Sequence, residues 1–414
     1  MSEALSDFGL IALTEYQAPG APAHHVVERL RDRLSRLLGG EPGEAVQDDS
    51  LRRAGNEVLE ATVHDPDFHA LPALLIDAVH DWRHDSEASR VRVLVLPPCE
   101  PVDLVAELAR RHAMATLDPP SRRSLLERPD QPIEEPAGDG IIVVPRLQDW
   151  FLRHPRGLER CRALLLRVGA GDRRWLIGVD AWSWRYLVRA AQADLLLPTP
   201  LVLPPFDADR LAAWLATLLD ADGERVVNIR AVDEATDVFA RDDEGHLSHD
   251  YLRELAAHSR GIPWVAWHLW HRGLSTMPES SDTDESLDAG PDRESGNGPR
   301  EQSERGEGGD EAATCSERGT TLWVTHDADR LLPSGHETDA LLVLQAVLIH
   351  GGLSRVDLEL VLPMKLELEA LLCALRRAGF LECHADTGLW TVLPCAYPGV
   401  RTALEEAGWS MAVL

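Results

Sequence analysis

Three short apolar runs with helical stretches between them constrain the fold of this 414-residue chain more than any other feature. The runs cover residues 91–96, 140–144 and 175–179, and a weaker fourth covers residues 201–203. Each run is nearly continuous rather than alternating, a pattern typical of strands that are buried on both faces. Such strands, alternating with helices, predict an α/β fold with a parallel sheet that helices cover on both faces.

The predicted helices carry apolar side chains at helical spacing, so each presents one apolar face. Helices separate the strands of the α/β region, and the stretch before residue 86 is mainly helical. Asp207 caps the first helix after the fourth strand. The helices are expected over residues 23–38, 56–82, 102–111, 147–152, 158–167, 182–193, 207–218 and 247–274, the last being broken at Gly261-Ile262-Pro263.

The C-terminal part has a different order of elements. Three helices are expected over residues 337–350, 355–362 and 366–378, before a hairpin formed by residues 379–392 and a last helix over residues 397–407. Three helices and a two-stranded wing describe a winged helix. A winged helix that reads DNA needs basic residues on its third helix and wing, but residues 333–409 hold ten acidic and five basic residues. The charge therefore favours docking to a protein.

Residues 275–320 differ from the rest of the chain in composition. They contain 13 acidic residues against four arginines, and no Val, Ile, Phe, Trp or Tyr. Such a segment cannot bury enough apolar surface to offset the entropy lost on ordering, so we expect it to be disordered. It is either an acidic tail for a partner or, in the more ordinary interpretation, a solvated insertion between two packed pieces.

Lys365 is the single lysine among the 41 basic residues. A phosphate-binding P-loop lysine or a Schiff-base lysine would have to be built on it, and its neighbours Met364 and Leu366 provide neither context. Arginine cannot replace lysine as a base, because guanidinium stays protonated. The sequence therefore excludes lysine-centred catalysis, although a GC-rich genome or a salty cytoplasm would also produce an arginine-rich, acid-rich composition.

Acidic residues outnumber basic ones by 69 to 41, which gives a formal net charge of −28. This balance argues against general binding to nucleic acid, which rewards a basic face. The first residues lack the basic and apolar regions of a signal peptide, and no apolar run is long enough to span a membrane. The six cysteines form no CxxC pair. We therefore expect a cytoplasmic protein with reduced thiols and no membrane insertion.

The order of elements resembles the layout of AAA+ and STAND-type P-loop ATPases, with bacterial origin-recognition-like members as the nearest analogue. The resemblance extends over roughly residues 50–410. It implies a degenerate P-loop-ATPase-like α/β core, a helical lid and a C-terminal winged helix. The expected regions are a mainly helical N-terminal region 1–85, the core 86–205, the lid 206–274, the disordered acidic insertion 275–320 and the winged-helix domain 321–414.

The phosphate-binding motif that this family carries after its first strand is missing. The family has GxxxxGK[ST] there, and the amides and lysine of that motif hold the phosphates. The matching residues 96–104 contain no glycine and no lysine. Prolines such as Pro98 remove amide donors, Cys99 follows, and Glu100 and Asp103 would repel phosphate.

The other ATPase positions are altered as well. The second buried strand should end in an acidic pair that holds magnesium and polarises water, but Pro145 and Arg146 stand there. Asp180 ends the third strand, where the family has a polar sensor. Arg260 matches the lid position from which a sensor arginine reaches the nucleotide. The resemblance thus implies a vestigial nucleotide site at Pro98, Cys99, Glu100, Pro145, Arg146, Asp180 and Arg260, at which ATP is not expected to bind.

A retained frame without its two catalytic motifs predicts a pseudo-ATPase. This would be a catalytically inactive AAA+-like scaffold or regulator that binds a protein partner, such as an active ATPase or another effector. The alternative is a nucleotide-responsive, DNA-associated switch protein whose winged helix contacts DNA. Arg153, Arg156, Arg173 and Arg174 could act in trans as arginine fingers, although exposed arginines are ordinarily only solvated. The sequence leaves the oligomeric state open.

Histidines and tryptophans offer two further hypotheses. His64, His69, His80 and His84 lie in one stretch, and the last two have the spacing of a helical metal-ligand pair for a metal-dependent hydrolase. The charges around them favour an ordinary solvated face. Tryptophans in the third-strand and lid regions either form a surface for a partner or, as we prefer, fill the contact between core and lid. These tryptophans are Trp175, Trp182, Trp184, Trp264, Trp267 and Trp270.

Overall fold

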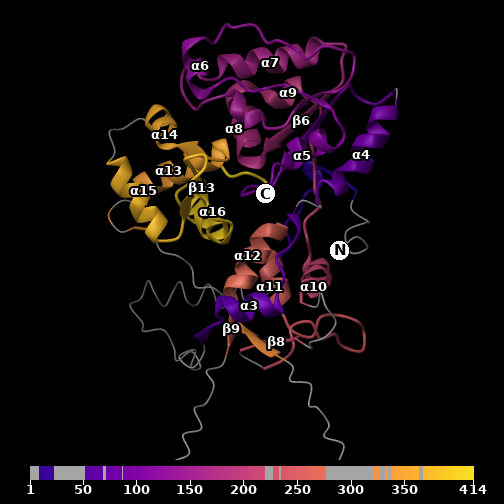
Figure 1. Ribbon diagram of the computed structural model, residues 1–414, viewed down its shortest axis with the longest axis vertical. Helices are drawn as coiled ribbons and strands as arrows, with labels where there is room; N and C mark the ends of the chain where they lie inside the picture. Colours follow the sequence, from indigo (N-terminus) through magenta and orange to yellow (C-terminus); the bar gives the residue numbers. More distant parts are fainter. Residues whose placement is uncertain are drawn as a thin grey trace, which may run out of the picture.

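The architecture comes from a computed structural model with an α/β core, a second unit of helices with a small sheet, and a C-terminal unit (Figure 1). The predicted helix over residues 23–38, His69, Lys365 and most of the acidic insertion lie outside the described residues. The structure describes residues 9–22, 52–68, 71–85, 87–219, 227–232, 235–276, 320–325, 332–333, 335, 337–362 and 367–414.

The core contains a six-stranded sheet in the order β1-β7-β3-β6-β5-β4. Its strands are β1 (Ile11–Ala12), β3 (Val91–Leu96), β4 (Ala115–Thr116), β5 (Ile142–Val144), β6 (Trp175–Asp180) and β7 (Leu201–Val202). All pair in parallel except β1, which is antiparallel to β7. Every residue of β6 is buried, as expected for a strand covered on both faces. The prediction of an α/β fold is confirmed, and the mostly parallel sheet is compatible with a P-loop-like core.

Helices of the core begin where short polar side chains accept hydrogen bonds from first-turn amides. Asp103 caps α5, Ser121 caps α6 and Asp180 caps α8, which satisfies donors that a helix leaves unpaired.

Residues 147–152, predicted as a helix, form only the 3₁₀ turn η4 (Leu147–Trp150). The core helices are α4 (Ala73–His84), α5 (Leu104–Arg111), α6 (Arg122–Glu127), α7 (Glu159–Ala170), α8 (Ala181–Ala191) and α9 (Ala193–Leu196), and a 3₁₀ turn η1 (Leu13–Glu15) follows β1.

The second unit combines helices of the predicted lid with α3 (Asn56–Thr62) from the predicted N-terminal region and with a sheet that the sequence did not predict. Its other helices are α10 (Ala208–Ala216), α11 (Tyr251–His258) and α12 (Pro263–Gly273). The sheet has the order β2-β9-β10-β8 and consists of β2 (Arg52–Arg53), β9 (Leu274–Thr276), β10 (Thr320–Val324) and β8 (Val227–Ala231). Leu274 on β9 lies opposite Val324 on β10. The two ends of the acidic insertion are thus neighbours in one sheet, and the expected boundary at residue 320 falls inside β10.

The C-terminal unit follows the predicted order, with helices and a three-stranded antiparallel sheet in the order β11-β13-β12. The additional strand β11 joins the predicted hairpin through Leu353, which pairs with Trp390. The elements are α13 (Glu337–His350), β11 (Leu353–Ser354), α14 (Arg355–Val361), α15 (Leu368–Arg377), β12 (Leu381–Cys383), β13 (Leu389–Val392), the 3₁₀ turn η5 (Pro394–Ala396) and α16 (Tyr397–Glu406). Among the described helices, none is long and apolar enough to cross a membrane.

Candidate functional site

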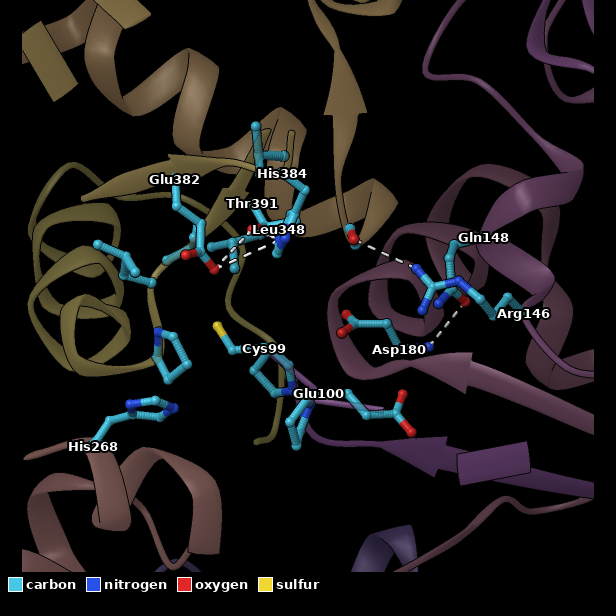
Figure 2. A pocket seen from close by; sticks show the side chains of 17 residues that line it. Cys99, Glu100, Arg146, Gln148, Asp180, His268, Leu348, Glu382, His384 and Thr391 are labelled. Atoms are coloured by element: carbon cyan, nitrogen blue, oxygen red, sulfur yellow. Dashed lines mark hydrogen bonds and ion pairs between the residues drawn. The ribbon is translucent and has the colours of Figure 1, made fainter. Parts of the chain in front are cut away.

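The candidate site is a cavity of about 280 Å³ at the carboxyl edge of the parallel sheet (Figure 2). Open parallel sheets bind ligands at this edge, where the order of strands reverses. Here β6 lies on one side of β3, and β7, which follows β6 in the chain, lies on the other. The loops after β3 and β5 and the end of β6 form one wall, while α12 and the C-terminal unit form the other.

The amides at the start of α5 are occupied by carboxylates of this chain. The amide of Leu104 donates to Glu100 Oε1 at 2.6 Å, and the amide of Ala106 donates to Asp103 Oδ1 at 2.8 Å. Amides at a helix N-terminus form a ready anion site, and a P-loop uses them for phosphate. In this protein the carboxyl groups of Glu100 and Asp103 already accept from these donors, so the helix has few free amides left for a phosphate.

Two carboxyl groups on the core side of the cavity resist ionisation. Burial raises the pKa of Glu100 to about 8, against the hydrogen bond from Leu104. Burial likewise raises the pKa of Asp180 to about 7, although its Oδ1 accepts from the amide of Trp182 at 2.7 Å and Arg146 also favours the charged form. The amide of Asp180 donates to Gln148 Oε1 at 3.2 Å. Near neutral pH both carboxyls are therefore partly protonated and serve as structural polar groups.

Arg146 is the main cation of this wall, and its guanidinium is used within the protein. Its Nε donates to Asp149 at 3.2 Å and its Nη2 donates to the carbonyl of Gly351 at 3.4 Å. Burial would lower the pKa of Arg146, but four surrounding carboxylates outweigh burial and raise it. A β-carbon at Gly351, whose φ is +61°, would lie 2.7 Å from Arg146 Nη2. Glycine suits this position because its φ is positive and because any side chain there would make the Arg146 guanidinium shift.

The opposite wall adds acidic and imidazole side chains from the C-terminal unit. Thr391 Oγ1 donates to Glu382 at 3.4 Å, and His384 Nε2 lies 2.9 Å from Thr391 Oγ1. Cys99 faces this group in Figure 2, with its backbone at φ +58°. Burial, reinforced by Asp180, raises the pKa of the Cys99 thiol well above its ordinary value. A thiol of this kind is a poor nucleophile.

The predicted site residues divide into two groups. The structure brings Pro98, Cys99, Glu100, Arg146 and Asp180 together around the cavity. The other two predicted residues do not line it. Pro145 packs through its carbonyl against β6, and Arg260 points elsewhere, since its Nη2 donates to the carbonyl of Val413 at 2.8 Å. The position expected of a sensor arginine thus holds the end of the chain instead of facing the cavity.

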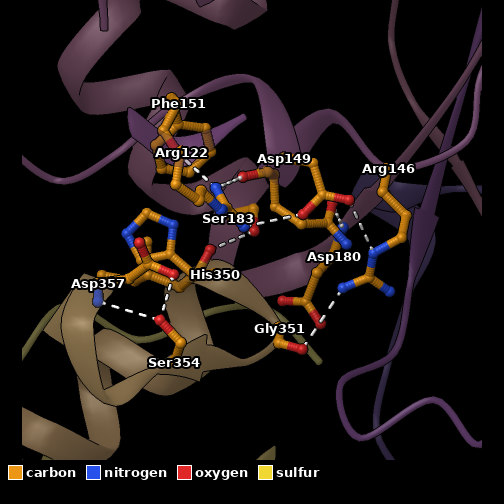
Figure 3. A network of polar contacts seen from close by, with 12 residues as sticks. Arg122, Arg146, Asp149, Phe151, Asp180, Ser183, His350, Gly351, Ser354 and Asp357 are labelled. Carbon is orange, nitrogen blue, oxygen red and sulfur yellow. Dashed lines mark hydrogen bonds and ion pairs between the residues drawn. The ribbon is translucent and has the colours of Figure 1, made fainter. Parts of the chain in front are cut away.

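A polar network fixes the C-terminal unit against the core beside the cavity (Figure 3). Ser183 on α8 donates to the carbonyl of Ile349 on α13. The amide of Arg153 donates to His350 Nε2 at 3.2 Å, and Arg153 Nη1 donates to Gln345 Oε1 at 2.6 Å. These contacts join segments far apart in the sequence, so sequence reasoning gave no sign that the C-terminal unit completes the site.

Comparison of the chain with models of protein families, with characterised proteins and with solved structures found no significant match. The site must therefore be interpreted from its own geometry. Sequence reasoning missed its outer wall, whose lining includes His268, Gly351, Glu382, His384 and Thr391. Only Glu382 and His384 on the predicted hairpin carried a signal, since residues two apart on a strand share a face, and Thr391 lies opposite Glu382 on the partner strand.

The metal hypothesis finds no support in the part of the chain that the structure describes. No cluster of three His, Cys, Asp or Glu side chains there has a geometry suited to a metal ion. His80 and His84 do lie together, with ring centroids 4.3 Å apart, and His84 Nδ1 lies 2.8 Å from the carbonyl of His80. None of the described cysteines is in a disulfide.

The tryptophans are internal packing residues, and at Trp264 this includes the expected contact between core and lid. All six are buried, and Trp264 and Trp270 are fully so. Trp264 on α12 donates from Nε1 to the carbonyl of Pro98 at 2.7 Å, which ties the second unit to the loop after β3. Trp182 on α8 donates to the hydroxyl of Tyr397 at 3.2 Å and so contacts the C-terminal unit. An aromatic surface for a partner does not form from these residues.

Proposed function

We propose that this chain is a pseudo-ATPase, an AAA+-like cytoplasmic scaffold or regulator that neither binds nor hydrolyses ATP and acts by binding a protein partner. The observation that carries this proposal is the occupation of the α5 amides by Glu100 and Asp103. A triphosphate would have to displace both carboxyl groups and bring its own charge beside Asp180 and Glu382 in the same small cavity. Like charges held together in a poorly hydrated site are costly.

The C-terminal unit suits the role of a winged helix used for protein docking. Its order of one helix, a strand, two helices and a hairpin supports this comparison, since a winged helix has the same order. The expected recognition helix α15 carries Glu369 beside Arg376 and Arg377. Residues 333–409 around this helix carry ten acidic and five basic residues, and this charge balance disfavours binding to DNA. An active ATPase or another effector is the kind of partner this proposal implies.

An arginine finger for a neighbouring ATPase is less well supported. Arg153 donates to Gln345, Arg173 to the carbonyls of Pro136 and Gly140, and Arg174 to the carbonyls of Trp82 and Asp85. Three of the four candidate side chains therefore have internal partners. The fourth, that of Arg156, is exposed.

Calorimetric titration of the full chain with ATP and magnesium tests the proposal directly. We expect no binding heat up to millimolar ATP, because the phosphate donors are taken. Micromolar affinity would overturn the pseudo-ATPase assignment and favour the nucleotide-responsive switch. Affinity purification from the native host tests whether the chain binds a protein partner. We expect a stable, stoichiometric partner to be recovered with it. Recovery of the chain alone would count against the scaffold role.

A further inference from the structure

A second cavity, of about 550 Å³, lies between α8, α13 and the residues after α16. We call it the arginine groove. It is separate from the carboxyl-edge cavity, and the two share no lining residue. Its lining includes three arginines and three aromatic residues, which are Arg153, Arg185, Arg189, Trp182, Tyr186 and Trp409.

Positive charge dominates the arginine groove. Three guanidinium groups line it, and none of the described lining residues carries a carboxylate. This is unexpected in a chain with 69 acidic and 41 basic residues. Concentrated cationic charge in a concave site attracts anions and raises their local concentration.

Most N–H donors of these three guanidinium groups make no hydrogen bond to the described residues. Arg153 uses Nη1 for Gln345 at 2.6 Å, and Arg185 uses Nε for Ser410 at 3.0 Å. Arg189 is exposed at the rim and donates to none of the described residues. A guanidinium has five N–H donors in a planar fork that matches the oxygens of phosphate and carboxylate. The two bonded arginines are thus held in place while most of their donors remain available.

The remaining walls are aromatic and apolar. Trp182, Arg185, Tyr186 and Arg189 follow one another at helical spacing, so they share one face of α8. Trp182 is 1% exposed and Ile349 4% exposed, which gives the groove a closed apolar floor. Tyr186 is held by stacking on Phe151, with ring centroids 5.3 Å apart. A flat ring can therefore lie beside Tyr186 or Trp409 while its anionic group reaches the arginines.

We propose that the arginine groove binds a small organic oxyanion, in which a phosphate or carboxylate is attached to a flat apolar ring. The volume lies within the roughly 300–1,000 Å³ typical of small-molecule sites, which combine apolar walls with a few polar groups. A protein partner would instead need a surface of about 800 Å² on each side. This inference is independent of the proposed scaffold function.

Binding in the groove has a structural consequence, because its walls come from two units. α8 belongs to the core, whereas α13 and the Ser410 segment belong to the C-terminal unit. A ligand that contacts both walls binds only the docked arrangement. By mass action it stabilises that arrangement and raises the melting temperature.

Four probes applied to the full chain test the proposal by calorimetric titration. Phenyl phosphate and phenylacetate carry a ring and an anion, inorganic phosphate carries only the anion, and benzyl alcohol carries only the ring. We expect one of the two ring anions to bind at least about tenfold more tightly than either partial probe, since each contributes only one of the two interactions. The tighter of the two ring anions identifies phosphate esters or carboxylates as the ligand class.

Matched variants locate the binding. Arg189→Gln should weaken the preferred ring anion about tenfold without affecting folding, because the Arg189 side chain has no partner to lose among the described residues. Arg377→Gln, at an exposed arginine on α15, should leave affinity unchanged. The proposal is overturned if inorganic phosphate or benzyl alcohol binds as tightly as the preferred ring anion, if Arg189→Gln does not change the affinity for that anion, or if no probe binds at millimolar concentration. Tighter binding of a polyglutamate peptide than of both ring anions would also overturn it, in favour of an acidic protein partner.

Discussion

At the scale of single residues, Glu100 gives the carboxyl edge its character, since it both occupies an amide of α5 and resists ionisation. The pKa of Glu100 is about 8 in the folded protein, against an ordinary value of 4.5. Between these values the folded state holds a proton that the unfolded state releases. The stability contributed by protonated Glu100 is therefore complete below about pH 4.5 and is lost as the pH rises towards 8.

Replacement of Glu100 by glutamine should remove this pH dependence. The amide oxygen of glutamine can still accept from Leu104, but the side chain never ionises. We expect Glu100→Gln to raise the free energy of unfolding by about 2 kcal/mol at high pH and by much less in acid. Urea denaturation at pH 5 and pH 8.5 measures the difference. Glu60→Gln, at an exposed position of α3, is the control, and equal effects of Glu100→Gln at both pH values would contradict the argument.

At the scale of elements, the contact between α5 and the sheet depends on Gly178 in the middle of β6. A β-carbon at Gly178 would lie 2.1 Å from the carbonyl oxygen of Pro145 and 2.8 Å from Val105 Cγ2. The first of these neighbours is backbone and cannot move aside. Pro145, which follows β5, is thus a packing residue whose carbonyl oxygen lies close against Gly178 of β6.

Two glycine-to-alanine substitutions distinguish the steric clash at Gly178 from the general effect of replacing a glycine by alanine. Gly178→Ala should lower the free energy of unfolding by about 3 kcal/mol, because either the strand or α5 must shift. Gly169→Ala in α7, where the nearest atom would be 3.7 Å away, should be neutral or stabilising by up to about 1 kcal/mol, since alanine favours helix. Thermal and urea unfolding of both variants provide the test. Similar losses at both positions would rule out the steric explanation.

Elements with a continuous or regularly spaced apolar pattern could be predicted from the sequence, and strands of the second unit without such a pattern could not. Continuous runs revealed β3, β5 and β6, and helical spacing revealed α13, α15 and α16. β2 has only two residues, and β8 and β10 come from distant parts of the chain. Their pairing is set by tertiary contacts, which override local preference.

At the scale of the whole molecule, the site is completed by docking of the C-terminal unit onto the core. The core wall was predictable because strand ends follow from apolar runs, and the carboxyl ends of parallel strands meet at one edge. The outer wall was not, because Glu382 and His384 reach the cavity only through contacts such as that between Arg146 and Gly351. Arg260 departed from expectation because its backbone adopts φ +57°, and its guanidinium donates to Val413.

We expect His350 to make this docking sensitive to pH. Its side chain is fully buried between the units and packs against Phe151 in a tilted arrangement, with ring centroids 4.9 Å apart. Burial, reinforced by Arg122 and Arg153, lowers the pKa of His350 well below its ordinary value of 6.5. As the pH falls through 6.5, His350 binds a proton in the unfolded chain but stays neutral in the folded protein. The stability tied to neutral His350 is therefore complete above about pH 6.5 and is lost in acid, opposite in direction to the effect of Glu100.

His350→Gln tests this coupling, because glutamine can accept from the amide of Arg153 without becoming charged. Between pH 6.5 and 5 the wild-type protein should lose about 2 kcal/mol more stability than the variant. Urea denaturation measures the difference, and hydrogen exchange of α13 should show the wild-type helix losing protection first. His246→Gln, at a side chain that is 67% exposed, should retain the wild-type pH dependence. If His350→Gln retains it as well, the pH sensitivity of docking originates in other groups.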